Sequence, residues 1–300
     1  MSLQNYSITE EDILILYYIQ KYKFLSVTQT HKVIATKMKK PSISRKLKRL
    51  QDLGFLNYFG NCRIGFSRVP KIYYITENGY NFLLDEAIFN EETLGVFRKK
   101  SKPTWSPVFM HRLMLIDVCI SLELAIKDRP ELSITKVLLD YNIDSHGHRE
   151  TMDYTGQERD NIHKIIPDAA IIIKNTDSNK SVLFFIELDR GTETIRKAVN
   201  GGEDLHSIHY RMRKYDRYLL SRNYTKKYQQ YGEIKSFILL FVTTVNERIE
   251  NIRERMEDLP KELSNFYLFN SFEKVTENFF NVNWKNRNIN DNQFYKLPGS

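Results

Sequence analysis

The feature that most constrains the fold is a short basic helix with one apolar side, predicted over residues 39–50. Pro41 suits the first turn of a helix, where its missing N–H donor is not needed. Ile43, Leu47 and Leu50 follow at spacings of four and three residues, which places them on one helical face. The remaining positions carry hydroxyl and basic side chains: Ser42, Ser44, Arg45, Lys46, Lys48 and Arg49. We therefore expect the apolar side to pack on a small core while the polar side stays exposed.

The basic helix occupies the third place in a regular order of predicted elements. Hydroxyl and acidic residues over 7–12 indicate the start of a first helix, and a second short helix is predicted over 26–35. After Gly54, an extended run over 55–59 and a returning strand over 71–76 predict a hairpin, which carries Arg63, Arg68 and Lys71. Thr76 is expected to cap a further helix. Helix, helix, basic helix, hairpin, helix is the plan of a winged helix-turn-helix domain, which we expect over 1–88.

The charge of the chain is concentrated in this first part. Residues 1–110 hold 17 Lys and Arg against 9 Asp and Glu, whereas residues 111–300 hold 28 of each, so the net charge of +8 belongs to the first third. A basic surface of this kind releases counterions from DNA phosphates when it binds. Double-stranded DNA is the predicted partner, and an acidic protein bound by the basic hairpin is an alternative. The candidate DNA-contacting residues are Ser42, Ser44, Arg45, Lys46, Lys48, Arg49, Arg63, Arg68 and Lys71.

Composition excludes several other classes of protein. The 300 residues suffice for two packed cores, and no apolar run approaches the ~18 residues of a membrane span. The first residues lack the pattern of a signal peptide, so we expect a cytoplasmic protein without membrane attachment. Cys62 and Cys119 are too few for a disulfide framework or a cysteine-based zinc site. The chain also lacks a phosphate-binding Gly-x-x-x-x-Gly-Lys loop and a dinucleotide-binding glycine motif.

A second domain is predicted beyond a basic, proline-containing linker at 89–108. Over 109–280 apolar segments of strand and helix length alternate, which predicts an α/β or α+β domain with a mixed sheet flanked by helices. We expect strands at 134–139, 165–173, 181–189, 234–242 and 266–269, and helices at 111–126, 192–218 and 246–259. The helix at 192–218 is expected to break near Gly201, and the Asn-rich tail at 281–300 is expected to be poorly ordered.

Acidic residues stand at the ends of two of these predicted strands. Asp168 follows a proline where one strand starts, and Glu187 and Asp189 end the next strand with both side chains on one face. Acids that meet in one cleft can bind a hard divalent cation. Because such acids repel one another, they need cationic partners. Arg190, one residue on, and Lys197 and Lys214 on the following helix are available. A purely structural network of ion pairs is the alternative to a metal site.

This layout resembles the PD-(D/E)xK nuclease-like fold, through Pro167–Asp168 and Glu187–Leu188–Asp189. The resemblance implies a restriction-endonuclease-like domain with Asp168 and Glu187 as metal ligands, and Mg²⁺ as the one cofactor indicated. The catalytic set would comprise Asp168, Glu187 and Asp189, with Lys197 or Lys214 assisting. However, Asp189 stands where active members have lysine. We therefore favour a nuclease-derived scaffold that no longer cleaves, and retained metal-dependent cleavage is the second interpretation.

Taken over most of the chain, the sequence resembles the replication-relaxation family. The resemblance rests on the winged helix, His111, Pro167–Asp168, the string at 184–193 and Lys214–Tyr215. It implies a bacterial protein of a plasmid or other mobile element that acts in replication or copy-number control, DNA relaxation or transcriptional regulation. Our leading hypothesis is a sequence-specific DNA-binding protein whose second domain forms a homodimer or docks a replication or mobilisation protein. A Mg²⁺-dependent endonuclease or nickase using Asp168 and Glu187 is the alternative, as is a protein-interaction adaptor.

Overall fold

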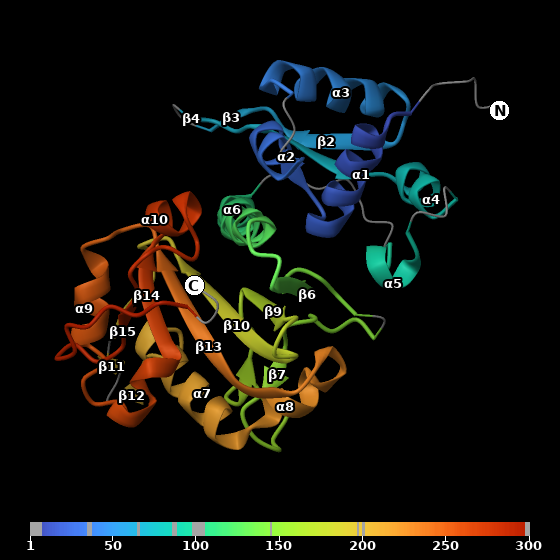
Figure 1. Ribbon diagram of the computed structural model, residues 1–300. Coiled ribbons are helices and arrows are strands. Elements are labelled where there is room, and N and C mark those ends of the chain that lie inside the picture. The colour runs from blue at the N-terminus through green and yellow to red at the C-terminus, as the bar shows by residue number, and fades with distance from the viewer. Residues whose placement is uncertain are drawn as a thin grey trace. The chain divides into compact units, whose positions relative to one another are not determined.

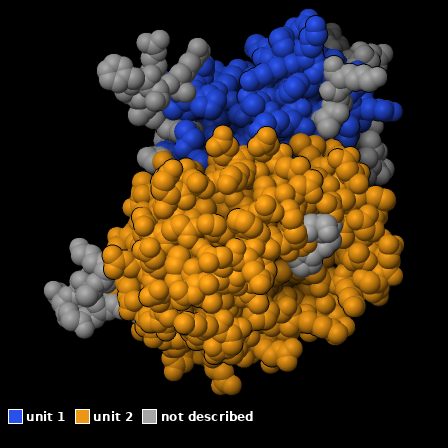
Figure 2. Space-filling model, turned by 60° about the vertical axis from the view of Figure 1, so that its left-hand side comes forward, with its two compact units in different colours: residues 1–120 blue, residues 121–300 orange. Residues whose placement is uncertain are grey.

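The computed structural model contains two compact units, residues 1–120 and residues 121–300 (Figure 2). It describes residues 8–34, 38–64, 67–85, 89–97, 106–144, 146–196, 198–199 and 202–297. The boundary between the units falls inside helix α6 (Pro107–Lys127). The domain limits predicted from the sequence, with their linker at 89–108, stay a prediction.

The first unit is a winged helix-turn-helix, as predicted. Strands β1, β5 and β2 form an antiparallel sheet in that order, and the short strands β3 and β4 extend the hairpin between β2 and β5 (Figure 1). Its elements before α6 are α1 (Glu10–Tyr22), β1 (Leu25–Ser26), α2 (Val27–Ile34), α3 (Lys40–Asp52), β2 (Leu56–Gly60), β3 (Arg63–Ile64), β4 (Ser67–Arg68), β5 (Lys71–Ile75), α4 (Glu77–Asp85) and α5 (Glu91–Leu94).

Local signals in the sequence account for the ends of these helices. Thr9 caps α1: its hydroxyl accepts from the N–H of Asp12, whose carboxylate accepts from the N–H of Thr9. The hydroxyl of Thr76 accepts from the N–H of Gly79 at 3.2 Å, which confirms the predicted cap of α4. Glycine is required at 79 because a Cβ there would lie 2.3 Å from the carbonyl oxygen of Phe55. Helix α4 thus packs directly against the backbone that leaves α3.

The second unit is built on a six-stranded mixed sheet with the order β15-β14-β13-β10-β9-β6. Strand β10 pairs parallel with β13 and antiparallel with β9, so its continuous apolar run is central in the sheet, as predicted. After α6, the elements are β6 (Leu132–Leu139), β7 (Asp153–Tyr154), β8 (Lys164–Ile165), β9 (Ala169–Asn175), β10 (Lys180–Asp189), β11 (Ala198–Val199), β12 (Gly202–Glu203), α7 (Ile208–Ser221), α8 (Asn223–Lys227), a 3-10 turn (Gln229–Tyr231), β13 (Ile234–Thr243), α9 (Arg248–Glu254), a 3-10 turn (Lys261–Phe266), β14 (Tyr267–Ser271), α10 (Phe272–Glu277) and β15 (Lys285–Asn286).

One face of this sheet packs against α7, α8 and α9 to form the main core of the unit. Phe185 and Phe237 lie at its centre, where they contact a group of buried tyrosines. The tyrosines of this group are Tyr215, Tyr218, Tyr224 and Tyr228. Because every odd residue of β10 from Leu183 onward shares this face, Glu187 and Asp189 also point toward the helices. The sheet therefore places two carboxylates at the border of an apolar core.

The segment between β10 and α7 differs from the prediction of a largely helical stretch over 192–218. The structure begins the helix only at Ile208, after the short antiparallel pair β11 and β12. The hydroxyl of Ser207 accepts from the N–H of Tyr210 and so caps α7. Gly191, with φ of +79°, turns the chain away from β10. The turn at Gly191 and the cap at Ser207 therefore restrict the helix to the second half of the predicted range.

The C-terminal segment also differs from the prediction, which expected poor order over 281–300. Through residue 297 it is packed: β15 pairs with β14, and Trp284 and Arg287 are buried. Arg253 and Arg287 hold this segment in place. Arg253 donates from Nε to the carbonyl oxygen of Asn286 at 2.7 Å, and Arg287 donates to Asp216 at 2.7 Å. The asparagines of this segment form hydrogen bonds in its turns, so a prediction of disorder from the asparagine content was wrong for the residues described.

None of the helices within the described ranges has both the length and the apolar character needed to cross a bilayer.

Candidate nucleic-acid interface and acidic centre

Helix α3 presents the predicted polar surface on its outer side. Ile43, Leu47 and Leu50 are fully buried, so the opposite face is turned outward. On that face, Arg45 and Lys48 are exposed, and their hydrogen bonds and ion pairs with described residues are to neighbours on α3. Arg45 donates from Nη2 to the hydroxyl of Ser42 at 3.3 Å, and Lys48 pairs with the exposed Asp52 at 2.5 Å. Ser44 is exposed beside them. Contacts of this kind between exposed groups contribute little energy and are easily exchanged for a ligand.

Lys46 and Arg49 have a different orientation from the rest of this surface. Lys46 donates from Nζ to Asp12 at 3.1 Å and to the hydroxyl of Thr9 at 2.9 Å. Arg49 Nη1 lies 3.5 Å from the second oxygen of Asp12, a residue with no exposed area. These two cations neutralise a buried carboxylate and so fasten α3 to α1. Their predicted contact with DNA stays a prediction, and their observed contacts are structural.

The hairpin carries the remaining predicted basic residues. Arg63 and Arg68 occupy paired positions across β3 and β4, and their side chains lie outside the described residues. Lys71 is half-buried at the base of the hairpin, with Nζ 3.7 Å from the ring centroid of Tyr58 and 3.2 Å from Oε1 of Gln51. Burial lowers the pKa of Lys71, and the nearby charge of Lys48 lowers it further. The base of the hairpin therefore joins the basic surface of α3.

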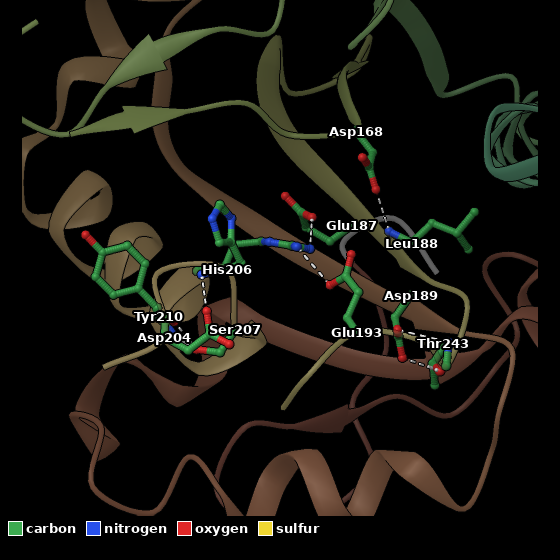
Figure 3. Close-up of polar contacts among 12 residues, drawn as sticks. Asp168, Glu187, Leu188, Asp189, Glu193, Asp204, His206, Ser207, Tyr210 and Thr243 are labelled. Atoms are coloured by element: carbon green, nitrogen blue, oxygen red, sulfur yellow. Dashed lines mark hydrogen bonds and ion pairs between the residues drawn. The ribbon is translucent and has the colours of Figure 1, made fainter. Parts of the chain in front are cut away.

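In the second unit, the three predicted acids lie at one end of the central strands. Asp168 immediately precedes β9, and the antiparallel register pairs Ala169 with Ile186, so Asp168 adjoins Glu187. One oxygen of Asp168, Oδ2, accepts from the N–H of Leu188 at 2.8 Å (Figure 3). The fold thus brings together residues that are nineteen apart in the sequence. This juxtaposition is what the spacing of the two strands predicted.

Both oxygens of Glu187 are engaged by side chains from α7. Its Oε1 accepts from the hydroxyl of Tyr215 at 2.5 Å, and its Oε2 accepts from Nη1 of Arg211 at 2.8 Å. Arg211 also donates from Nη2 to Glu193 at 2.8 Å, so one guanidinium bridges two carboxylates. The side chain of Glu187 is only 4% exposed, against 27% for Arg211. The cation at this acidic centre is therefore a residue of the protein itself.

The burial of this centre changes its proton affinity. The pKa of Glu187 is raised from 4.5 to about 8, mainly by removal from water, with Arg211 opposing this rise and the neighbouring Asp168 adding to it. Burial acts against the charge of Arg211, but Glu187 and Glu193 outweigh it and raise the pKa of the guanidinium. Burial also raises the pKa of Tyr215, so its hydroxyl stays protonated and continues to donate. The centre keeps a permanent positive charge and a carboxyl group that titrates near neutral pH.

Asp189 is bound just as completely, by a different arginine. It has no exposed area, and its Oδ2 accepts from Nε of Arg248 at 2.7 Å and from the hydroxyl of Thr243 at 3.0 Å (Figure 3). Its Oδ1 accepts from the N–H of Gly191 at 2.9 Å. Arg248 additionally donates to the carbonyl oxygen of Glu193. Asp189 therefore fixes the turn that follows β10 and the start of α9.

These residues do not fit a divalent cation. A hard cation needs several carboxylate oxygens directed at one point, yet both oxygens of Glu187 and both oxygens of Asp189 accept hydrogen bonds within the protein. Arg211 would also place a positive charge beside the metal. Among the residues that the structure describes, three acidic or imidazole groups come within 4.8 Å of one another only at Glu158, Asp160 and His163, on the surface.

Of the two lysines that were expected to assist catalysis, the structure describes only Lys214, which forms no ion pair with Asp168, Glu187 or Asp189 within the described residues. Lys197 lies outside the described residues. Lys214 has its Nζ 3.5 Å from the carbonyl oxygen of Asn161. The sequence interpretation gave no role at the acidic centre to Arg211, Tyr215, Glu193 or Arg248, although Tyr215 and Glu193 lie in segments that carry the family resemblance. One signal was available for two of them, since Arg211 and Tyr215 are four residues apart and share a helical face.

Comparison with known proteins adds the following findings. Residues 16–234 match the model of a family described as Replication-relaxation. Among solved structures, the chains that are similar over a part of their length include that in the crystal structure of Bacillus subtilis PadR in complex with operator DNA. It is 19% identical, the similarity covers 39% of this chain and 67% of that chain, and the TM-score is 0.23. No match was found among curated proteins.

Proposed function

Because this chain belongs to the replication-relaxation family, we propose that it is a duplex-DNA-binding protein of a bacterial plasmid or another mobile element. Its role would lie in replication or copy-number control, DNA relaxation or transcriptional regulation. The observation that carries the proposal is the two-sided character of α3. Its outer face carries exposed basic and hydroxyl side chains, and its opposite face carries fully buried apolar side chains.

Helix α3 suits the major groove for two reasons. Its exposed Ser44, Arg45 and Lys48 combine donors for base edges with positive charge for phosphates. Its buried side is fixed by apolar packing and by the ion pairs of Lys46 and Arg49 with Asp12, so the outer face is held rigidly. The hairpin places Arg63 and Arg68 on an extension of the sheet, where a winged helix contacts the DNA backbone.

The test is a gel-shift titration with the Arg45→Ala/Lys48→Ala double variant. We expect binding to weaken by about tenfold or more, because charge-assisted hydrogen bonds to phosphates or bases are lost. The slope of log affinity against log salt should fall by up to about 2. The matched control is Lys180→Ala/Lys226→Ala, which removes the same charge from exposed positions of the second unit. Equal affinity of both variants for duplex DNA would contradict the proposal.

For the second unit, we propose a scaffold that does not cleave DNA and serves in dimerisation or partner docking. The supporting observation is that Arg211 pairs with Glu187 and Arg248 pairs with Asp189, which are two of the three acids in the predicted catalytic set. The corresponding experiment incubates supercoiled plasmid with the protein and Mg²⁺ or Mn²⁺. We expect no nicking or linearisation. Cleavage by the wild type that Asp168→Ala abolishes would instead establish the nuclease alternative.

A further inference from the structure

A pocket of about 450 Å³ lies beside the acidic centre, at the start of α7. It is formed by the segment after β10, the segment before α7 and the first turns of α7 itself. Figure 3 shows Asp204, His206 and Ser207 on its α7 side, with Glu193 and the acidic centre adjacent. We call it the α7 pocket. The residues that line it are Glu193, Thr194, Asp204, Leu205, His206, Ser207, Arg211 and Lys214.

Lys214 is the side chain of the α7 pocket that indicates which kind of ligand could bind there. It is half-buried, and its Nζ contacts the carbonyl oxygen of Asn161 at 3.5 Å and lies 5.5 Å from the ring centroid of Tyr210. Within the described part of the chain, no carboxylate forms an ion pair with it. Burial lowers the pKa of Lys214, and the positive charges of Arg211 and Lys164 lower it further. Asp160 acts in the opposite direction but does not outweigh these effects, so an anion bound here would stabilise the charge of Lys214.

The acids of the α7 pocket do not supply that compensation. Glu193 is held by Arg211 at 2.8 Å, and Oδ1 of Asp204 accepts from the N–H of His206 at 2.9 Å. The first N–H groups of α7 are also engaged, because those of Ile208 and His209 donate to carbonyl oxygens of the segment after β10. A ligand would therefore be held by side chains of the pocket, and the helix end is not its binding site.

We propose that the α7 pocket binds the phosphate group of a nucleotide unit directly and without a metal ion. The Nζ of Lys214 would donate to the phosphate, and the neighbouring Arg211 would add its positive charge. A cavity of about 450 Å³ has the size of small-molecule sites and exceeds what a phosphate group alone would fill. Leu205, 55% exposed at the pocket, supplies an apolar surface for the nucleoside part. The nucleotide unit is either a free mononucleotide or the terminal residue of a strand, which share this chemistry.

The test is calorimetric titration in EDTA with three probes: thymidine, thymidine 5′-monophosphate and a 5′-phosphorylated oligothymidylate. We expect the phosphorylated probes to bind and thymidine to bind at least about tenfold more weakly. Binding of the oligonucleotide alone identifies a strand terminus as the ligand, and equal binding of both phosphorylated probes identifies a free nucleotide as sufficient. Each result supports the proposal. Equal binding of thymidine, or binding of no probe by the wild-type protein, overturns it.

Variants then locate the site. Lys214→Gln should weaken binding of the phosphorylated probes by about tenfold or more, whereas Lys214→Arg should retain it. Lys226→Gln, at an exposed position of α8, is the charge-matched control and should bind as the wild type does. Unchanged binding by Lys214→Gln overturns the assignment. The inference does not rest on DNA binding by α3, because the Arg45→Ala/Lys48→Ala variant should bind these probes normally.

Discussion

Glu187→Gln tests whether the buried carboxyl of Glu187 binds a proton in the folded protein as the pH falls below about 8. In the folded protein burial raises the pKa of Glu187 from 4.5 to about 8, so the folded state binds more protons than the unfolded state between these values. Stability contributed by this group is therefore complete below pH 4.5 and is lost as the pH rises toward 8. Each unit of difference between the two pKa values is worth about 1.4 kcal/mol, which gives roughly 5 kcal/mol over the whole range.

The assay is urea unfolding at a series of pH values from about 5 to about 8.5, a range set by these pKa values. Trp284 is fully buried in the second unit, so its fluorescence reports unfolding of that unit once Trp105 has been replaced by phenylalanine in both proteins. We expect Glu187→Gln to gain stability relative to the wild type as the pH rises, by up to roughly 5 kcal/mol.

Comparing the two proteins at each pH cancels every other titration that they share. A difference in unfolding free energy that stays constant within about 1 kcal/mol over this range would refute the reasoning. It would mean that Glu187 stays ionised throughout as an ordinary partner of Arg211. A difference of the opposite sign would mean that the ion pair outweighs the cost of burial.

Three further predictions concern packing and buried charge. Arg248→Met leaves Asp189 buried without its cation and should lower the unfolding free energy of the second unit by about 3–5 kcal/mol in the same fluorescence assay; a loss below about 1 kcal/mol would contradict this. Leu47→Ala opens a cavity in a fully buried position and should cost about 2–5 kcal/mol, seen as earlier loss of helical circular dichroism from the first unit. Arg287→Met removes the cation from Asp216 and should cost about 3–5 kcal/mol; thermal unfolding like that of the wild type would show that the C-terminal segment is dispensable.

The winged helix could be predicted almost entirely because its signals are local. The spacing of the apolar residues identified the buried face of α3, Thr76 identified the start of α4, and turn residues identified the hairpin. Local signals were less informative where long-range contacts decide the packing. Lys46 looked like a surface cation, but α1 places Asp12 within 3.1 Å of it. The Asn-rich tail looked disordered, but Arg253 binds its carbonyl groups.

For the second unit, the sequence by itself determined that acids would stand at the ends of neighbouring central strands. Strand periodicity and apolar runs are properties of short segments, so these patterns alone were enough to place Asp168 and Glu187 side by side. Only the tertiary structure decided what these acids do. Arg211 is 24 residues from Glu187, and Arg248 is 59 residues from Asp189. No local pattern links such distant charges, and it is the packing of α7 and α9 on the sheet that sets both arginines among the acids and turns an expected metal site into an ion network.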